Sequence, residues 1–150
     1  MSFEAGGRTF TGCTVESFAA TARGLGADAV GINCSLGPKE ILPFAQRLCR
    51  SVPAGVPVFV KPNAGLPNPD GSYNLNASEF AAEMKAYASI GVSMVGGCCG
   101  TTPEHIARLV GATRGCPIVS RETSPRCVIS GRTQSLSLDE GPLIIGERLN

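Results

Sequence analysis

Several residue types are scarce in this chain of 150 residues. Trp is absent, aromatic residues make up 5% of the chain, and there is a single His. The 13 basic and 12 acidic residues leave a net charge of +1. The shortage of aromatic side chains argues against a platform for stacking nucleic-acid bases. The balanced charge gives no electrostatic case for binding nucleic acid or an anionic membrane.

Long apolar runs and targeting patterns are also missing. No run is long enough for a bilayer, which needs about 18 apolar residues or more, so we predict no transmembrane helix. The start of the chain, MSFEAGG, has no basic n-region and no apolar h-region, so we predict no secretion signal. The seven cysteines are odd in number and are not spaced like a disulfide framework. We therefore expect a cytoplasmic protein with reduced thiols, in which clustered cysteines indicate a metal site or catalysis.

Helix-like and strand-like segments alternate along most of the chain. We predict helices over residues 14–23, 39–50, 76–90 and 102–110, and short apolar strands over 29–34, 56–61 and 92–96. Such alternation is typical of right-handed βαβ units and a parallel sheet. The strands are almost wholly apolar, as expected when both faces of the sheet are covered. Residues 1–3 are interpreted as the remnant of one earlier strand.

The pattern changes near residue 111, where Ser, Thr, Arg and Pro begin to dominate. We expect a first unit over residues 1–112 and a linker over residues 113–141. Residues 142–150 have the pattern of a strand and a turn, and we interpret them as the opening of a second domain.

Three cysteines occupy related positions in this pattern. Cys34 follows one apolar strand, and Cys98 and Cys99 follow another. Functional residues of parallel α/β folds collect at the carboxyl ends of strands. Neighbours in a regular strand point to opposite faces, so the backbone at Cys98 and Cys99 must kink, and the flanking glycines permit this. The pattern predicts a zinc site with three thiolates and an open fourth position, which is the arrangement of a catalytic zinc.

Three other interpretations of the cysteines remain open. Neighbouring cysteines can form a disulfide, although their Cα atoms are closer than the usual span of such a bond. All three can be buried core cysteines, because free Cys is among the most buried residue types. A structural zinc knuckle usually has four ligands from local pairs, whereas only three are visible here.

Other candidates in the sequence are weaker. Asn63 can offer a carbonyl oxygen as a tentative fourth ligand, although loop Asn side chains more commonly bond their own backbone. His105, the single histidine, is expected at the surface rather than in a metal site. The remaining cysteines show no metal-binding spacing and are treated as structural: Cys13, Cys49, Cys116 and Cys127.

The motifs resemble those of the homocysteine S-methyltransferase family. Residues 31–38 (GINCSLGP), 61–67 (KPNAGLP) and 96–106 (GGCCGTTPEHI) are similar to its last three strand-end motifs, in the same order and at suitable spacing. The resemblance implies a (β/α)8 TIM barrel, of which only the C-terminal half is present. It also implies a zinc ion held by Cys34, Cys98 and Cys99, with Asn63 matching an Asn that fills the fourth position in some members.

The resemblance also implies a reaction. It predicts methyl transfer to the thiol of homocysteine, giving methionine, with no catalytic residue beyond the zinc ligands. Residues 144–150 (IIGERLN) resemble the first strand of the folate-binding domain in the cobalamin-dependent members. Those members use methylcobalamin, which is regenerated from methyltetrahydrofolate, and both bind on other domains. Two alternatives remain: a methyltransferase that uses betaine or S-methylmethionine, and an inactive zinc-binding fragment that needs the missing half of the barrel.

Overall fold

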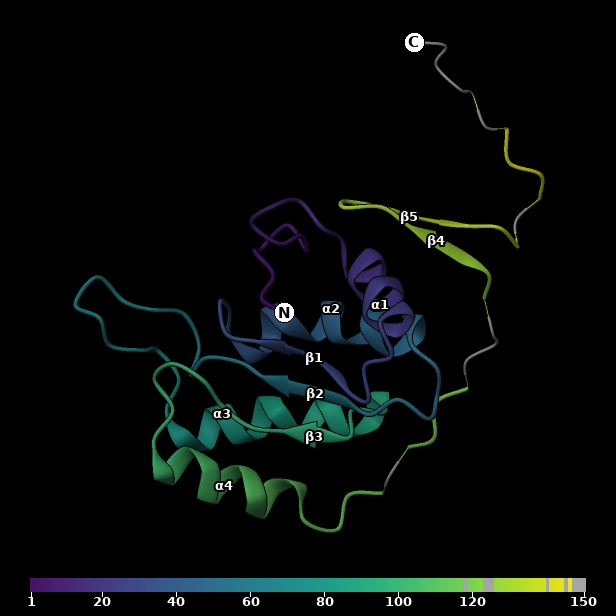
Figure 1. The fold of residues 1–150 in the computed structure, drawn as a ribbon. Coiled ribbons are helices and arrows are strands. Elements are labelled where there is room, and N and C mark those ends of the chain that lie inside the picture. Colours follow the sequence, from purple (N-terminus) through teal and green to yellow (C-terminus); the bar gives the residue numbers. More distant parts are fainter. Residues whose placement is uncertain (118, 123–125, 140, 145, 147–150) are drawn as a thin grey trace.

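The computed structural model describes residues 1–117, 119–122, 126–139, 141–144 and 146. A three-stranded parallel sheet lies at its centre, in the order β1–β2–β3 (Figure 1). The strands are β1 (Val30–Asn33), β2 (Val58–Lys61) and β3 (Met94–Val95). The helices are α1 (Val15–Gly24), α2 (Pro38–Ser51), α3 (Ala77–Met84), the 3-10 helix η1 (Lys85–Ile90) and α4 (Pro103–Thr113). The mixed α/β class with parallel strands is confirmed, and each predicted helix and strand is found with shifted ends.

Local signals in the sequence explain where the helices begin. The Thr14 side chain accepts a hydrogen bond from the Ser17 amide at the start of α1. Asn76 and Glu79 form a reciprocal capping box at the start of α3. The single helix predicted over residues 76–90 is in fact an α-helix that tightens into η1 after Met84. Gly91 then ends η1 in the left-handed conformation, which glycine adopts without steric penalty.

The hydrophobic core lies between one face of the sheet and the helices. Val58, Val60 and Ile32 are fully buried on that face. Helix α2 packs on β1 and β2, while α1 packs against α2 and α3 packs on α4. The sheet therefore has one well-covered face.

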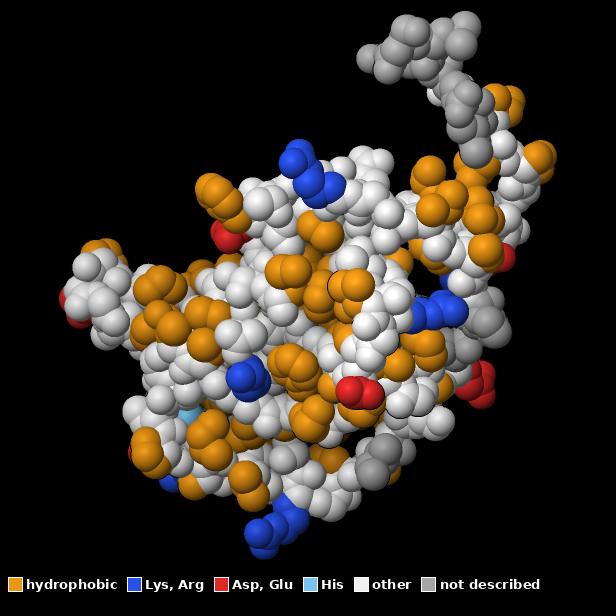
Figure 2. Space-filling view, viewed as in Figure 1, with side chains coloured by type: hydrophobic (Ala, Val, Ile, Leu, Met, Phe, Trp, Pro, Cys, Tyr) orange, Lys and Arg blue, Asp and Glu red, His pale blue; other side chains and the backbone are white. Residues whose placement is uncertain are grey.

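The opposite face of the sheet is open. Phe59 is half-buried there, Lys61 is exposed, and Met94 is 49% exposed. The ring of Phe59 lies over Gly31, where a β-carbon would come within 2.4 Å of it. Figure 2, drawn from the same side as Figure 1, shows hydrophobic side chains across the middle of this view. Covered faces are therefore found on one side of the sheet only, because no helix lies over this face among the described residues.

The first residues run along the free edge of β1. The Met1 amino group donates to the Gly31 carbonyl at 2.9 Å, and the Asn33 amide donates to the Met1 carbonyl at 3.0 Å. This segment is not a regular strand. Its hydrogen bonds nevertheless lie where a neighbouring strand would place them, which agrees with the interpretation of residues 1–3 as a strand remnant.

A small hairpin follows the helical part of the chain. Strands β4 (Val128–Ser130) and β5 (Ser135–Ser137) pair antiparallel, within the segment predicted as a linker. The hairpin is attached to α1, since the Ser17 hydroxyl donates to the Gly131 carbonyl at 2.5 Å. Of the predicted second-domain segment, residues 145 and 147–150 lie outside the described residues, and the rest belongs to no helix or strand. None of the helices in the described ranges has the length and hydropathy needed to cross a membrane.

Candidate metal centre

The loop after β1 places Cys34 in an uncommon backbone conformation. Cys34 and Ser35 have φ angles of 67° and 69°, in the left-handed region that residues with a β-carbon rarely adopt. The Cys34 amide donates to the Lys61 carbonyl at 2.9 Å, and the Cys34 carbonyl accepts from the Leu36 amide at 3.0 Å. Such strain persists only where the surroundings hold the backbone firmly, and it occurs preferentially at functional sites.

The loop after β3 carries the other two cysteines. The Cys98 amide donates to the Pro62 carbonyl at 2.8 Å, and the Thr101 hydroxyl donates to the Cys98 carbonyl at 2.6 Å. The Cys99 carbonyl accepts from the Ala64 amide at 2.9 Å. The segment that follows β2 therefore supports the cysteine pair from one side.

The expected kink at the cysteine pair is present. Strand β3 ends at Val95, so both cysteines lie in a loop and not in a strand. Of the three flanking glycines, only Gly100 has a positive φ, at 77°. A β-carbon on Gly100 would also lie 2.4 Å from the ring of Tyr73. Gly97 is needed for space, because a β-carbon there would lie 2.4 Å from the Thr101 side chain.

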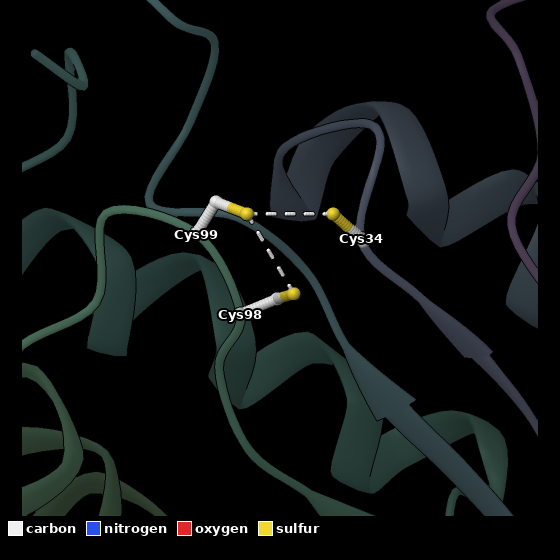
Figure 3. A group of neighbouring side chains, drawn as sticks. All are labelled: Cys34, Cys98 and Cys99. Atoms are coloured by element: carbon white, nitrogen blue, oxygen red, sulfur yellow. Dashed lines mark hydrogen bonds between the residues drawn. The ribbon is translucent and has the colours of Figure 1, made fainter. Parts of the chain in front are cut away.

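The three sulfur atoms face one another (Figure 3). The Cys34 and Cys99 Sγ atoms are 3.6 Å apart, and the Cys98 and Cys99 Sγ atoms are 3.9 Å apart. All three lie within 4.8 Å of one another, and no second group of metal-binding type occurs in the described part of the chain. Thiolates at about 2.3 Å from a tetrahedral zinc are about 3.8 Å apart. The spacing of the sulfurs therefore fits one zinc ion.

The structure also distinguishes between the interpretations left open above. All seven cysteines are free thiols, so the neighbours Cys98 and Cys99 form no disulfide. Cys34 and Cys98 are partly exposed and Cys99 is exposed, which contradicts the interpretation as buried core residues. Cys49, outside the cluster, is the buried one.

The cluster is electrostatically costly when its thiols ionise. Burial and hydrogen bonding with the Cys34 and Cys99 thiols raise the pKa of Cys98 to about 11. Burial also acts to raise the pKa of Cys34, but hydrogen bonds from the Ser35 backbone and the two other thiols outweigh it and leave that pKa lowered. Repulsion between neighbouring thiolates is relieved most directly by a bound cation.

Asn63 lies beside the cluster. The residue is 4% exposed, and its Oδ1 accepts a hydrogen bond from the Cys99 amide at 3.2 Å. The Asn63 amide donates to the Leu36 carbonyl in the loop after β1. This side chain thus contacts one cysteine loop while its backbone contacts the other. A carbonyl oxygen has two lone pairs, so the bond to Cys99 does not use its whole capacity as an acceptor.

His105 is placed elsewhere than predicted. It is 8% exposed, so the expectation of a surface position is wrong. Its Nδ1 pairs with the Thr102 hydroxyl at 2.9 Å, and its Nε2 lies 3.1 Å from the Leu75 carbonyl. The ring also packs edge-on against Phe80. His105 therefore caps the start of α4 and does not belong to the sulfur cluster.

Two residues that lie near the sulfurs were not predicted from the sequence. Asn33 donates a hydrogen bond from its side-chain amide to the Cys98 Sγ, at 3.7 Å. The Tyr73 ring covers Gly100, and burial and the nearby Cys99 thiol raise the pKa of Tyr73. Asn33 carries a signal that was available, because it is the one polar residue of an otherwise apolar strand. Nothing in the local sequence around Tyr73 indicates its position.

Comparisons with known proteins agree with this geometry. The sequence model of homocysteine S-methyltransferase matches residues 1–113. The chain is also similar to a methionine synthase of Mycobacterium leprae (strain TN), with 34% identity over 161 aligned residues. That alignment covers the whole of this chain but 13% of the relative, so the chain spans only a small part of the relative's length. With a family match over most of its length, the chain belongs to the homocysteine S-methyltransferase family.

Proposed function

We propose that Cys34, Cys98 and Cys99 hold a zinc ion and that this site serves methyl transfer to the thiol of homocysteine. The observation that carries the proposal is the mutual spacing of the three sulfurs, at 3.6 Å and 3.9 Å for the two measured pairs. Soft thiolate donors in tetrahedral array are typical of zinc. Three protein ligands also leave one position for a substrate atom, as in catalytic zinc sites.

The chemistry follows from the acidity of thiols. A free thiol has a pKa of about 8.5, so little of it is thiolate at neutral pH. When bound, zinc supplies the positive charge that deprotonates a coordinated thiol. The three cysteine sulfurs hold the ion, and we propose the Asn63 oxygen as a weak fourth ligand in the absence of substrate. Partial exposure of the thiols leaves the site open to a small substrate.

The transfer itself is a displacement at carbon. The homocysteine sulfur loses its proton to solvent and forms a bond to the methyl carbon of methylcobalamin. Methylcobalamin would supply the methyl group and keep the electron pair of its cobalt–carbon bond, so that methionine would be the product. The likeness to a methionine synthase supports this product. The resemblance of residues 144–150 to a folate-binding domain is the reason to prefer methylcobalamin, regenerated from methyltetrahydrofolate on other domains, over betaine or S-methylmethionine.

We further propose that residues 1–112 form the second half of a (β/α)8 barrel, followed by a linker and, from residue 142, the start of a folate-binding domain. The open face of the sheet, with Met94 49% exposed, supports this proposal. Side chains on the inner face of a barrel are normally buried by the remaining strands. We expect the chain alone to bind zinc, in a compartment such as the cytoplasm that keeps thiols reduced, and to need the first half of the barrel for turnover.

The test is the metal content of the purified, reduced chain. We expect about one zinc ion per chain, lost in Cys98→Ser because two thiolates cannot complete the site. Cys127→Ser is the matched control, since Cys127 is an exposed free thiol outside the cluster, and this variant should keep the metal. A folded chain that takes up no zinc, or a Cys98→Ser variant that retains it, would contradict the proposal.

A second measurement addresses the reaction. Methionine formation from homocysteine and methylcobalamin is measured with the chain alone and with the first half of the barrel supplied. We expect turnover only in the second case. Zinc binding without turnover in either case would favour the alternative of an inactive zinc-binding fragment.

A further inference from the structure

Hydrogen bonds to its backbone fix the position of Asn33 at the end of β1. Its backbone amide donates to the Met1 carbonyl at 3.0 Å, and its backbone carbonyl accepts from the Ser2 hydroxyl at 2.7 Å. In the parallel sheet it pairs in register with Lys61. Side chains alternate along a strand, and Ile32 is fully buried in the core, so Asn33 belongs to the opposite, open face. The backbone of β1 therefore places the side-chain amide of Asn33 at the end of the sheet where the cysteines lie.

The amide of Asn33 bonds one of the three clustered sulfurs. Its Nδ2 donates to the Cys98 Sγ at 3.7 Å, across a separation of 65 residues in the sequence. Within the ranges that the structure describes, this is the one N–H···S hydrogen bond from a side chain to the cluster. It joins the end of β1, next to Cys34, to the loop that carries the other two sulfurs.

A donor at this point has two physical effects on a thiolate site. Three thiolates and one divalent cation leave a net negative charge, which an N–H group partly offsets by hydrogen bonding to sulfur. The bond also restricts the direction in which the Cys98 sulfur points. Outer partners of this kind orient metal ligands and typically change metal affinity by about 10–100-fold when they are removed.

We propose that Asn33 is a positioning residue of the metal centre, which holds the Cys98 sulfur in place and offsets its charge through an N–H···S hydrogen bond. This inference rests on the proposed function, because it assumes that the cysteine cluster binds a metal. Asn33 acts on the ion through Cys98 and contacts no substrate atom. The bond is formed between β1 and the loop after β3, so it also fixes the two cysteine loops relative to each other.

The experiment compares Asn33→Ala, Asn33→Leu and Ser2→Ala in the full chain of 150 residues. Asn33→Leu keeps the approximate shape of the side chain and removes the donor, so it carries the test if the alanine variant does not fold. Ser2→Ala removes a contact to the Asn33 carbonyl and leaves the amide side chain intact, which makes it the matched control for the strand end. Zinc affinity is measured by chelator competition, and the absorption of the thiolate-to-cobalt bands is measured after loading with Co²⁺.

We expect both Asn33 variants to bind zinc about 10-fold more weakly or worse, and to shift the cobalt absorption bands. Ser2→Ala should bind zinc as the parent does and leave the bands in place. Unchanged affinity and unchanged bands in a folded Asn33 variant overturn this inference alone, because the parent still binds metal. A parent chain that takes up no metal overturns the proposed function and this inference with it. Equal weakening in Ser2→Ala also overturns the inference, since the effect then belongs to the strand end.

Discussion

The cysteine loops and the contact between α1 and α2 are built in opposite ways. The loops contain two non-glycine residues with positive φ and hold partly exposed thiols close together. The helical contact buries apolar side chains such as Val15 and Leu48 completely, and an ion pair spans its edge. Local strain and repulsion at the loops are unfavourable, and they persist because packing elsewhere is favourable. Stability and metal binding should therefore be separable by mutation.

The largest effect on stability is expected from the helical layer. Leu48→Ala removes a side chain with no exposed surface in the core, and we expect the free energy of unfolding to fall by about 2–5 kcal/mol. Urea denaturation followed by circular dichroism measures this change. Leu25→Ala is the control, because Leu25 is 83% exposed and its truncation should change stability by less than about 0.5 kcal/mol.

Zinc uptake by Leu48→Ala tests whether the core and the cysteine site are independent. The folded fraction of Leu48→Ala should still bind zinc with the stoichiometry of the parent, because Leu48 contributes to the core and not to the sulfur cluster. Loss of zinc from a folded Leu48→Ala chain would show that the core and the site are not separable.

A loss of stability no larger than that of Leu48→Ala, together with a large effect on the site, is expected from Gly100→Ala. An alanine at φ 77° costs about 1–2 kcal/mol in strain. Its β-carbon would also meet the Tyr73 ring at 2.4 Å, and relieving such a clash costs about 1–3 kcal/mol more. We expect weaker zinc binding, because Gly100 adjoins Cys99.

Gly115→Ala separates the two causes. Gly115 has a similar φ of 75°, but no atom lies within 4 Å of a β-carbon built there. This variant should show the cost of the backbone conformation alone and keep its zinc affinity. Equal losses of unfolding free energy in both variants would mean that the Tyr73 ring moves aside freely.

The smallest effect is expected from the ion pair at the edge of the helical contact. Two hydrogen bonds of 2.7 Å from Arg47 hold the pKa of Glu16 below its ordinary value, against the opposing effect of burial. Both side chains are more than a third exposed, so solvent screening limits the contribution to about 1 kcal/mol or less. A lowered carboxyl pKa contributes its full stability above the ordinary pKa, and that contribution is lost as the pH falls through the folded value.

Glu16→Gln should therefore lower the free energy of unfolding slightly at pH 7 and flatten its decline under acid conditions. Urea denaturation at several pH values between neutral and strongly acidic measures both effects. Glu104→Gln is the comparison, since its pair with Arg108 is longer, at 3.7 Å, and more exposed. An unchanged acid profile in Glu16→Gln would show that other carboxyl groups govern the decline.

Much of the local structure was predictable because its causes are local. Thr14 and Asn76 cap their helices through side-chain bonds that involve residues two or three positions away. The kink at Cys98 and Cys99 was predictable too, because neighbouring side chains of a regular strand cannot share one ion. The break of the third helix after Met84 was not predicted, and its residues show no proline or glycine before Gly91.

Other features depend on partners that are distant in the sequence. The buried His105 contacts the Leu75 carbonyl, 30 residues away. The hairpin over residues 128–137 is attached to α1 by contacts such as the one between Ser17 and Gly131, more than 100 residues apart. Composition alone classified this segment as a linker, because no local pattern records such contacts.

The sequence by itself determined the alternation of strands and helices, the placement of three cysteines at strand ends and the resemblance to a methyltransferase family. These follow from periodicity, caps and short motifs, each of which is contained in a few neighbouring residues. Only the tertiary structure decided that the sulfurs lie at the spacing of a single zinc ion, that Asn63 bonds the Cys99 amide and that Asn33 bonds the Cys98 sulfur. The physical reason is that these distances depend on how parallel strands pair. Pairing brings loops that are far apart in the chain together at the carboxyl ends of the strands.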